Sequence, residues 1–258
     1  MRVVSLACSN TEIVCALGCA ALLVGVDDHS DFPADVANAL PRVGPDLQID
    51  VGAVMDLEPD LVLASRTVPG HERVVESIEQ AGLELLAPEP VSLEDVYANI
   101  REIARALGVP ARGERLIGEM RGELVDRGSA RVRPRIVVQW WPRPTIAPGA
   151  LSWTTDLLTL VGAENPLGSE GVKSRPVGDG ELAELDPDVL VLSWCGVRPE
   201  KVRPEVVLTN PALRAVKAVR DGHVYCVPEA YLGRPGPRLV EGYRALRGVT
   251  EAYRRGGP

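Results

Sequence analysis

The sequence predicts an α/β fold of two similar lobes with parallel central sheets, and three observations carry this prediction. Residues 56–72 return in degenerate form as residues 184–200, with each matched pair 128 positions apart. Each copy places Pro-Asp before a short apolar, β-branched run, which is the pattern of a buried parallel strand. A helix-rich segment separates the two copies. A unit that recurs in this way indicates two lobes of one design joined by helices.

Length and charge limit the classes of protein to consider. The 258 residues are enough for two lobes of about 100 residues each. The formal net charge of −8 argues against nucleic acid and anionic membranes as main partners. No apolar run is long enough to span a membrane, and no secretion signal precedes the first predicted strand. We therefore expect either a protein whose signal was removed before Met1 or a cytoplasmic protein.

Five cysteines occur without a regular spacing: Cys8, Cys15, Cys19, Cys195 and Cys226. Their odd number favours free thiols over a disulfide framework. Cys15 and Cys19 stand four apart, a spacing that on a helix also fits a pair of metal ligands. We favour the interpretation that both are small apolar side chains of the core.

The N-terminal lobe is predicted to cover residues 1–90 and to begin with a strand at residues 2–6. Ser9 and Glu12 have the spacing of a capping box, so we expect the first helix to begin at Ser9. The same helix is expected to end before Gly18. The remaining expected elements are a strand at 23–26, the polar loop 27–33, a helix at 51–57, a strand at 61–64, a helix at 71–81 and a strand at 84–87.

Residues 91–131 are predicted to form a helical connection between the lobes. A helix capped by Ser92 is expected because its apolar residues recur at helical spacing. Gly108 ends this helix, and Pro110 begins a second one that reaches about residue 127. At about 1.5 Å per residue the second helix spans about 27 Å, which is enough to join two lobes.

The C-terminal lobe, residues 132–258, repeats the pattern of the first. Its expected elements are strands at 135–140, 188–193 and 224–227 and helices at 153–161 and 235–253. Ligands of open parallel sheets bind beyond the carboxyl ends of the strands. This rule places a ligand near Ser65 and Arg66 in one lobe and near Ser193 and Trp194 in the other.

Catalytic motifs are missing from the sequence. It contains no nucleophile elbow, phosphate-binding loop, dinucleotide fingerprint or zinc-type His-Glu-x-x-His pair. The three histidines, His29, His71 and His223, are few for acid–base catalysis, although carboxylates can take that role. A binding protein that is not an enzyme is therefore the favoured interpretation.

All four tryptophans fall in the C-terminal lobe. Trp140, Trp141 and Trp194 stand at predicted strand ends, where indole rings suit a large planar or apolar ligand. Ordinary core packing is the alternative, and it fits Trp153 best because this residue opens a helix. Tyr231 adds an aromatic ring in the loop before the last helix.

Charged and polar candidates lie in the loops at the strand ends. His29, in an acidic loop, is either a ligand contact or metal ligand, or one residue of a solvated turn. Arg66 and Arg234 stand at predicted cleft edges, where they either contact a ligand or belong to the ordinary surface. Glu72 and Glu200 occupy equivalent places in the repeat, each in the first turn of a predicted helix, where the helix dipole favours a carboxylate.

Four stretches of the sequence together indicate a family. They are Ser5-Leu6-x-x-Ser9-Asn10-Thr11-Glu12, Val24-Gly25-Val26 leading to Ser30-Asp31-Phe32-Pro33, Pro59-Asp60-Leu61-Val62-Leu63-Ala64, and Arg234-Pro235-Gly236-Pro237-Arg238. Over nearly the whole chain they resemble the substrate-binding proteins of ABC importers with a helical backbone, and most closely the cobalamin-binding branch. The resemblance implies two Rossmann-like lobes joined by a long backbone helix, with a ligand cleft between them. It further implies an extracytoplasmic monomer, without catalytic cofactor, that delivers cobalamin or a related corrinoid to an ABC permease.

The resemblance also implies the residues of the ligand site. His29 stands where the cobalamin-binding members have a tyrosine, and its imidazole is a candidate axial ligand to corrinoid cobalt. Ser65 stands where they have a tryptophan, Tyr231 near another tryptophan, and Arg234 at an arginine. The expected ligand contacts are Ser9, Asn10, His29, Ser65, Arg66, Trp140, Trp141, Trp194, Tyr231 and Arg234.

Docking to the permease is the role that the resemblance implies for Glu72 and Glu200. Glu72 matches by motif, and Glu200 by the internal repeat, the two glutamates that meet permease arginines. The alternatives for the whole chain are an iron-siderophore or haem binding protein of the same class, or a two-lobed tetrapyrrole-handling enzyme such as a metal chelatase. The chelatase would use His29 with nearby carboxylates, and a cytoplasmic location is the alternative to an extracytoplasmic one.

Overall fold

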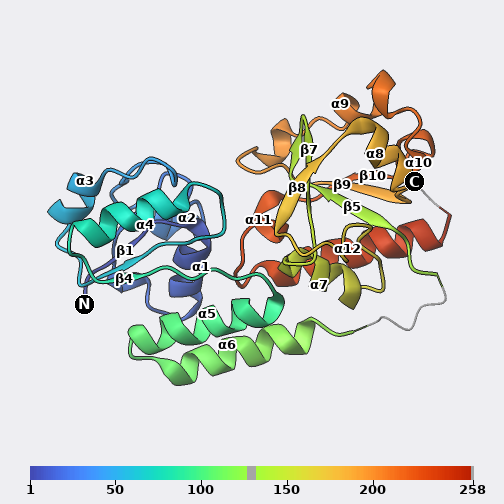
Figure 1. The fold of residues 1–258 in the computed structure, drawn as a ribbon. Coiled ribbons are helices and arrows are strands. Elements are labelled where there is room, and N and C mark those ends of the chain that lie inside the picture. The colour runs from blue at the N-terminus through green and yellow to red at the C-terminus, as the bar shows by residue number, and fades with distance from the viewer. Residues whose placement is uncertain (127–131, 257–258) are drawn as a thin grey trace. The chain divides into compact units, whose positions relative to one another are not determined.

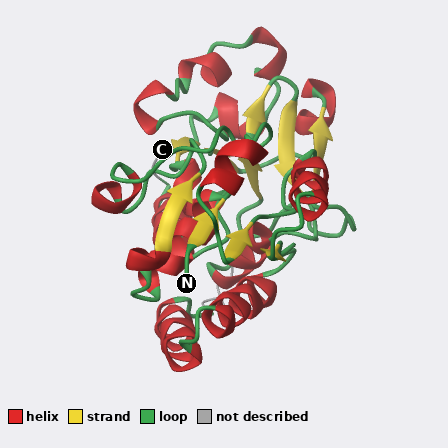
Figure 2. Cartoon of the chain, turned by 90° about the vertical axis from the view of Figure 1, so that its left-hand side faces the viewer, coloured by secondary structure: helices red, strands yellow, loops and turns green. Residues whose placement is uncertain are grey.

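The computed structural model describes residues 1–126 and 132–256, and it divides into two compact units (Figure 1). The first unit consists of Met1–Pro90 and Glu94–Met120, and the second of Val91–Leu93 and Arg121–Pro258. Strands in each unit are flanked by helices, as Figure 2 shows, and the predicted α/β fold class is confirmed. The predicted division at residues 90 and 131 stays a prediction. Within the described residues, no helix combines the length and apolar character needed to cross a membrane.

The first unit is built on a four-stranded parallel sheet in the order β2-β1-β3-β4. Its strands are β1 (Val3–Ser5), β2 (Leu23–Val26), β3 (Leu61–Leu63) and β4 (Leu85–Leu86). Its helices up to β4 are α1 (Cys8–Ala16), α2 (Ala34–Ala37), α3 (Val51–Asp56) and α4 (His71–Gln80), with the 3₁₀ helix η1 (Ala20–Leu22). Val4 and Val62 pair in register and pack in one buried cluster with Val74 and Ile78 of α4. Burial on both faces explains why these strands are continuous apolar runs.

The capping box predicted at Ser9 is wrong. Helix α1 begins at Cys8, and its N-cap is Ala7, which makes no side-chain capping bond. The polar side chains of the first turn bond to the sheet instead. Asn10 Nδ2 donates to the carbonyl of Ala64 at 2.6 Å, and Thr11 Oγ1 donates to Ser5 Oγ at 2.8 Å.

Two helices of 14 residues each, α5 (Leu93–Ala106) and α6 (Pro110–Glu123), lie side by side (Figure 1). Gly113 permits their close approach, because a Cβ atom there would lie 2.6 Å from the Cβ of Ala104. Arg112 of α6 donates to the carbonyls of Leu17 and Gly18 at the end of α1. The predicted extension of α6 to residue 127 is wrong: the helix ends at Glu123, after about 21 Å. Residue 127 itself lies outside the described residues.

The second unit has a parallel sheet in the order β10-β9-β5 and a smaller antiparallel sheet in the order β6-β7-β8. The parallel strands are β5 (Ile136–Gln139), β9 (Val189–Leu192) and β10 (Val224–Cys226). The antiparallel strands are β6 (Trp141–Pro142), β7 (Thr145–Pro148) and β8 (Ser174–Val177). The small sheet was not predicted, because each of its strands contains a proline, which normally argues against a strand.

Most helices of the second unit are short, and α12 is the longest of those described. The helices are α7 (Trp153–Leu160), α8 (Asp179–Glu184), α9 (Glu205–Leu208), α10 (Lys217–Arg220), α11 (Glu229–Leu232) and α12 (Leu239–Arg254), with the 3₁₀ helices η2 (Pro199–Lys201) and η3 (Pro211–Leu213). Helix α12 begins at Leu239 rather than at residue 235. Pro235 and Pro237 lack the N–H groups that a helix interior requires, which accounts for the later start.

The internal repeat has a structural counterpart in how each central strand begins. In the first unit the backbone N–H of Arg2 donates to Asp60 Oδ2 at 2.6 Å. In the second unit the N–H of Arg135 donates to Asp188 Oδ2 at 2.8 Å. In both units the arginine guanidinium also donates to a carbonyl at the end of the helix that precedes the Pro-Asp pair, that of Leu57 after α3 and that of Leu185 after α8. The aspartate of each Pro-Asp pair therefore fixes the starts of two adjacent strands.

Asp188 should contribute more to stability than its counterpart Asp60. Asp188 also accepts bonds from Lys217 Nζ at 2.5 Å and from Tyr253 Oη at 2.8 Å. Its side chain is 13% exposed, whereas that of Asp60 is 59% exposed. We expect Asp188→Ala to lower the free energy of unfolding by about 2–3 kcal/mol, and Asp60→Ala to lower it by less than half as much, in urea titrations. Equal losses would contradict this reading.

The pH dependence of the stabilisation by Asp188 gives a further check. Burial opposes ionisation of Asp188, but the bonds from Lys217, from the Arg135 N–H and from Tyr253 outweigh it and hold the pKa of Asp188 below its usual value. The stabilisation is therefore present above the unfolded pKa of about 3.9 and is lost as pH falls through the lower folded pKa. The difference between wild type and Asp188→Ala should shrink below about pH 4.

Candidate ligand-binding site

Three loops meet at the carboxyl end of the first unit's sheet: residues 27–33 after β2, 64–70 after β3, and 44–50 before α3. The N–H of Asp28 donates to the carbonyl of Gly44 at 2.9 Å, which joins the first loop to the third. Parallel strands release their following loops at the same edge, where ligands of such sheets bind. These loops hold the predicted site residues of this unit that follow α1.

A buried network supports the loop that follows β2. The carboxylate of Asp27 accepts the backbone N–H of His29 at 2.9 Å and the hydroxyl of Ser30 at 2.5 Å. Burial raises the pKa of Asp27, while these two bonds partly oppose that effect. From the other side, Arg42 donates to the carbonyls of Asp27 and Ser30. These bonds fix the backbone of the loop, and the side chain of His29 remains partly exposed to solvent.

His29 is 49% exposed, and its Nε2 lies 3.5 Å from Asp46 Oδ1. The second oxygen of Asp46 lies 3.5 Å from Nε2 of His71, which is buried. Within its own loop, His29 bonds to Asp27 through its backbone N–H and not through its ring. Asp46 and His71 were not predicted, because both are distant from His29 in sequence and no local motif joins them.

The electrostatics of this trio favour an ionised Asp46. The hydrogen bond from His71 is the main cause that lowers the pKa of Asp46; burial opposes it, and the nearby His29 ring adds to it. Each of the three loops also carries one large apolar residue that is exposed. These residues are Phe32, Leu47 and Val68, and we call them the apolar rim.

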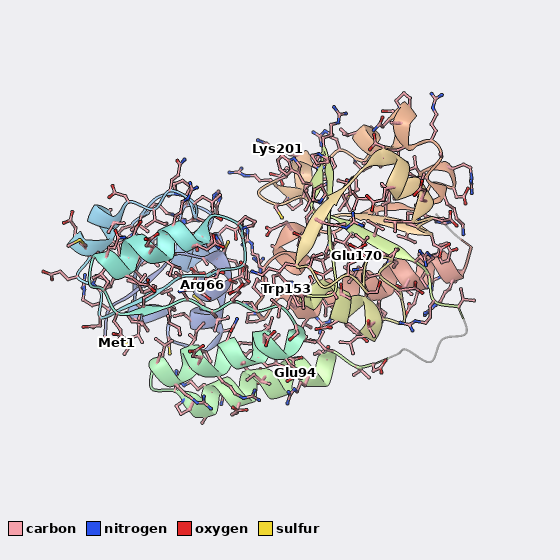
Figure 3. All side chains as sticks on the ribbon, viewed as in Figure 1. Met1, Arg66, Glu94, Trp153, Glu170 and Lys201 are labelled. Carbon is pink, nitrogen blue, oxygen red and sulfur yellow. The ribbon has the colours of Figure 1, made fainter. Side chains whose placement is uncertain are left out.

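The other predicted residues of the first unit lie close to this edge. Ser9 and Asn10 are buried, and Asn10 holds the end of β3 through Ala64. Ser65 is nearly buried, and its hydroxyl lies 2.9 Å from that of Thr67. Arg66, labelled in Figure 3, follows β3, and its guanidinium lies 3.5 Å from a carboxylate oxygen of Glu79.

Trp194 lies just beyond the end of β9, and its ring is buried rather than exposed at the strand end. Its side chain is 6% exposed and packs in the core cluster with Leu190 and Leu192. Its Nε1 donates to Gln139 Oε1 at 2.9 Å. Side chains alternate along a strand, and Trp194 continues the face of Leu190 and Leu192 beyond the end of β9.

The remaining tryptophans are divided between core and surface. Trp153 is buried and donates from Nε1 to the carbonyl of Leu232 at 2.7 Å, so the core position expected for it is confirmed (labelled in Figure 3). Trp140 stacks against Trp153, with ring centroids 6.4 Å apart. Trp141, in β6, is 46% exposed. It therefore offers an accessible indole ring.

Two buried polar atoms at the end of the second unit's sheet lack a hydrogen-bond partner within the described residues: Trp140 Nε1 and Ser193 Oγ. Gln139 pairs with Leu192, so the residues that follow them, Trp140 and Ser193, share one face. Buried polar groups are almost always bonded to protein or to water. This corner has the polarity to hold a water molecule or a polar atom of a ligand.

Tyr231 and Arg234 belong to the turn between β10 and α12. Arg234 Nε donates to Glu229 Oε2 at 3.2 Å, and both side chains are largely buried. The guanidinium carbon of Arg238 lies 5.8 Å from the centre of the Tyr231 ring, a cation–π distance. Gly242 of α12 allows the turn to pack closely against the helix, because a Cβ atom there would collide with the carbonyl oxygen of Tyr231.

Both docking candidates are exposed and follow the strand-end loops. Glu72 lies in the first turn of α4, and its carboxylate accepts the N–H of Gly70 at 2.8 Å. Glu200 lies in the short helix η2. Glu72 therefore makes the local bond expected at a helix start, whereas Glu200 stands in a single 3₁₀ turn.

The five cysteines are free thiols. Burial is the main cause that raises the pKa of Cys15 to about 11, which disfavours the thiolate that binds metals. Among the residues that the structure describes, no group of three or more His, Cys, Asp or Glu side chains is arranged to hold a metal ion.

Comparison with known proteins places this geometry in context. Residues 3–231 match the family described as periplasmic binding protein. An uncharacterised ABC transporter substrate-binding lipoprotein of Bacillus subtilis is 28% identical over 95% of this chain and 78% of its own length. A vitamin B12-binding protein of Vibrio parahaemolyticus is 26% identical over 93% of this chain and 85% of its own length. A periplasmic haem-binding protein from Roseiflexus, solved in apo form, is 26% identical, with a TM-score of 0.80 over 98% of this chain and 97% of its own.

Trp194 is a core residue, so its removal should affect stability. Because the ring is buried, Trp194→Ala should lower the free energy of unfolding by about 3–5 kcal/mol. Trp141→Ala is the matched control, and its exposed ring should cost less than about 0.5 kcal/mol. Urea unfolding followed by circular dichroism measures both. A Trp194→Ala variant as stable as the wild type would place this residue outside the core.

Proposed function

The chain belongs to the periplasmic binding protein family, and from this premise we propose that it is the ligand-binding component of an ABC importer for cobalamin or a related corrinoid. The observation that carries the ligand class is His29, an accessible imidazole whose Nε2 lies 3.5 Å from Asp46 and whose loop also carries Phe32 of the apolar rim. Relatives of the chain include vitamin B12-binding proteins, which supports a corrinoid as the ligand. We propose binding and delivery, rather than catalysis, as the role of the site.

The imidazole is suited to a metal that is already held by a macrocycle. Nε2 of His29 faces Asp46, and within the described residues Nδ1 has no partner. A neutral imidazole nitrogen is a good ligand for cobalt or iron. One nitrogen fills one coordination position, which is what a corrin or porphyrin leaves open on one side of its metal. We therefore propose that His29 Nδ1 takes an axial position of the bound ligand.

Apolar and aromatic side chains supply the remaining surface. Phe32, Leu47 and Val68 offer apolar contact to the edges of a large ring, and Trp141 offers an accessible indole. Ser65, Arg66, Tyr231 and Arg234 are proposed as polar contacts to its side groups. Ser9, Asn10 and Trp194 are buried, so we propose that they act through the shape of the strand ends and not by direct contact.

Haem is the second candidate ligand, and one comparison favours it. The Roseiflexus relative is a haem-binding protein of similar fold at 26% identity. Haem iron also accepts an axial imidazole, so His29 suits it as well. An iron siderophore is a weaker match, because its iron is already surrounded by oxygen donors and leaves no position for His29.

An extracytoplasmic location and an ABC permease partner belong to the same proposal. Curated relatives include a substrate-binding lipoprotein of an ABC transporter, which supports a protein that works outside the cytoplasm. We propose Glu72 and Glu200 as the points that meet basic residues of the permease. Both are exposed, and rim charges of this kind speed encounter and fix orientation.

Ligand identity can be decided by calorimetry with four compounds: cyanocobalamin, cobinamide, haem and a ferric hydroxamate siderophore. We expect a corrinoid to bind with micromolar or tighter affinity, about −8 kcal/mol or better. Cobinamide lacks the lower nucleotide, so it reports whether that part of cobalamin is recognised. Tight binding of haem without binding of either corrinoid would replace the proposed ligand by haem, and binding of the siderophore alone would remove the role of His29.

Docking can be tested separately from ligand binding. The double variant Glu72→Arg with Glu200→Arg should keep the ligand affinity of the wild type, abolish uptake in vesicles that contain the cognate permease, and remove the salt dependence of docking. The matched control reverses two other exposed glutamates, Glu76 and Glu205, on helices of the same two units. Uptake that survives the first double variant, or is lost equally in the control, would show that Glu72 and Glu200 are not the docking points.

A further inference from the structure

Two histidines, one on a loop and one at the start of a helix, share one carboxylate at the proposed ligand site. His29 comes from the loop after β2, His71 opens α4, and Asp46 comes from the loop before α3. Each oxygen of Asp46 lies 3.5 Å from one Nε2: Oδ1 from that of His29 and Oδ2 from that of His71. The proposed function uses the contact between His29 and Asp46 but assigns no role to His71.

The buried histidine fixes the carboxylate. Nδ1 of His71 accepts the backbone N–H of Val68 at 3.3 Å, so a neutral ring carries its proton on Nε2. That proton points at Asp46 Oδ2. The ring is buried and stands directly after Gly70, the N-cap of α4, so it has little freedom to turn. The backbone N–H of Leu47 also bonds to Asp46. The carboxylate is thus held in one orientation from the protein side.

The other oxygen of Asp46 then acts on His29. An ionised carboxylate only accepts hydrogen bonds, so it favours the tautomer of His29 that carries its proton on Nε2. The lone pair of that tautomer is on Nδ1. The backbone of His29 is held by its N–H bond to Asp27, and its ring contacts Asp46 through Nε2.

We propose that Asp46, held by His71, is the positioning residue that presents Nδ1 of His29 to the metal of the bound macrocycle. This inference rests on the proposed function. Carboxylates that accept the second N–H of a metal-binding histidine orient the ring and raise its basicity, and their loss commonly weakens metal affinity about 10- to 100-fold. Asp46 and His71 would then set the strength of axial ligation, and thereby the preference for a macrocycle with an open axial position.

The first test needs no ligand. The chain has only three histidines, so single variants assign all ring signals in long-range proton–nitrogen correlation spectra. At about pH 8, where imidazoles are neutral, wild-type His29 and His71 should both carry the proton on Nε2. Asp46→Asn should move His29 toward the Nδ1-protonated tautomer, because the amide can donate to Nε2. A His29 tautomer that is the same in both proteins would overturn the proposal.

The second test uses aquocobalamin and ferric haem as probes on the full chain. The visible spectrum of the bound probe should show imidazole ligation in the wild type and lose it in His29→Ala. Asp46→Asn should weaken binding about 10- to 100-fold and shift the spectrum toward that of His29→Ala. Asp50→Asn is the matched control: it lies in the same loop and caps α3 through the N–H of Ala53, so it should leave the spectrum unchanged.

The two tests separate failure of the inference from failure of the proposed function. If His29→Ala removes the ligation spectrum but Asp46→Asn has the spectrum and affinity of the wild type, the positioning role is overturned and the ligand assignment stands. If neither probe binds the wild type, the proposed function fails and the inference fails with it. If Asp46→Asn is too unstable to study, His71→Gln takes its place: its side chain can still donate to Asp46, so it should preserve the tautomer of His29 better than His71→Ala.

Discussion

Parallel pairing of the strands is the constraint on which the site in each unit depends. Because neighbouring strands run in one direction, the loops after β2 and β3 leave the first unit's sheet at the same edge. Residues that are far apart in sequence are thereby brought within reach of one another. Asp27, buried at the end of β2, and Arg42 hold the loop that carries His29, and the carboxylate of Asp46 joins that loop to α4. The side chains at this edge are thus positioned by bonds between loops that leave the sheet close together.

The second unit follows the same rule with different side chains. Its central strands begin at Arg135 and Asp188 as those of the first unit begin at Arg2 and Asp60, so the two copies share one structural device at the amino ends of their strands. At the carboxyl ends they have diverged. The first unit presents an imidazole and an apolar rim, whereas the second presents Trp141 and a corner where two buried polar atoms have no partner within the described residues. A shared start and different ends are consistent with a rigid scaffold whose loops carry the binding residues.

The sequence predicted those features that depend on local pattern. Apolar runs after Pro-Asp predicted the central strands, and glycines such as Gly18 and Gly162 marked the helix ends, where both adopt positive φ. It failed where tertiary contacts decide. Ser9 has the local signature of a cap, but the polar residues that follow it bond to the sheet. Proline concealed the strands β6 to β8. The partnership of His29 with Asp46 and His71 has no local signature, since it depends on how three loops meet.

Turn replacement in this scaffold is limited by a residue that no ligand would touch. Gly242 lies inside α12, where glycine is normally unfavourable, yet the turn with Tyr231 packs so closely against it that no larger side chain fits. Attempts to redesign selectivity by grafting the segment between β10 and α12 from another protein would therefore meet a fixed footprint. A graft can change the side chains at positions 231 and 234 only if the backbone at position 231 still packs equally close to Gly242. Packing against α12 therefore restricts the backbone conformations of this turn, and with them the changes in ligand recognition that substitutions in the turn can produce.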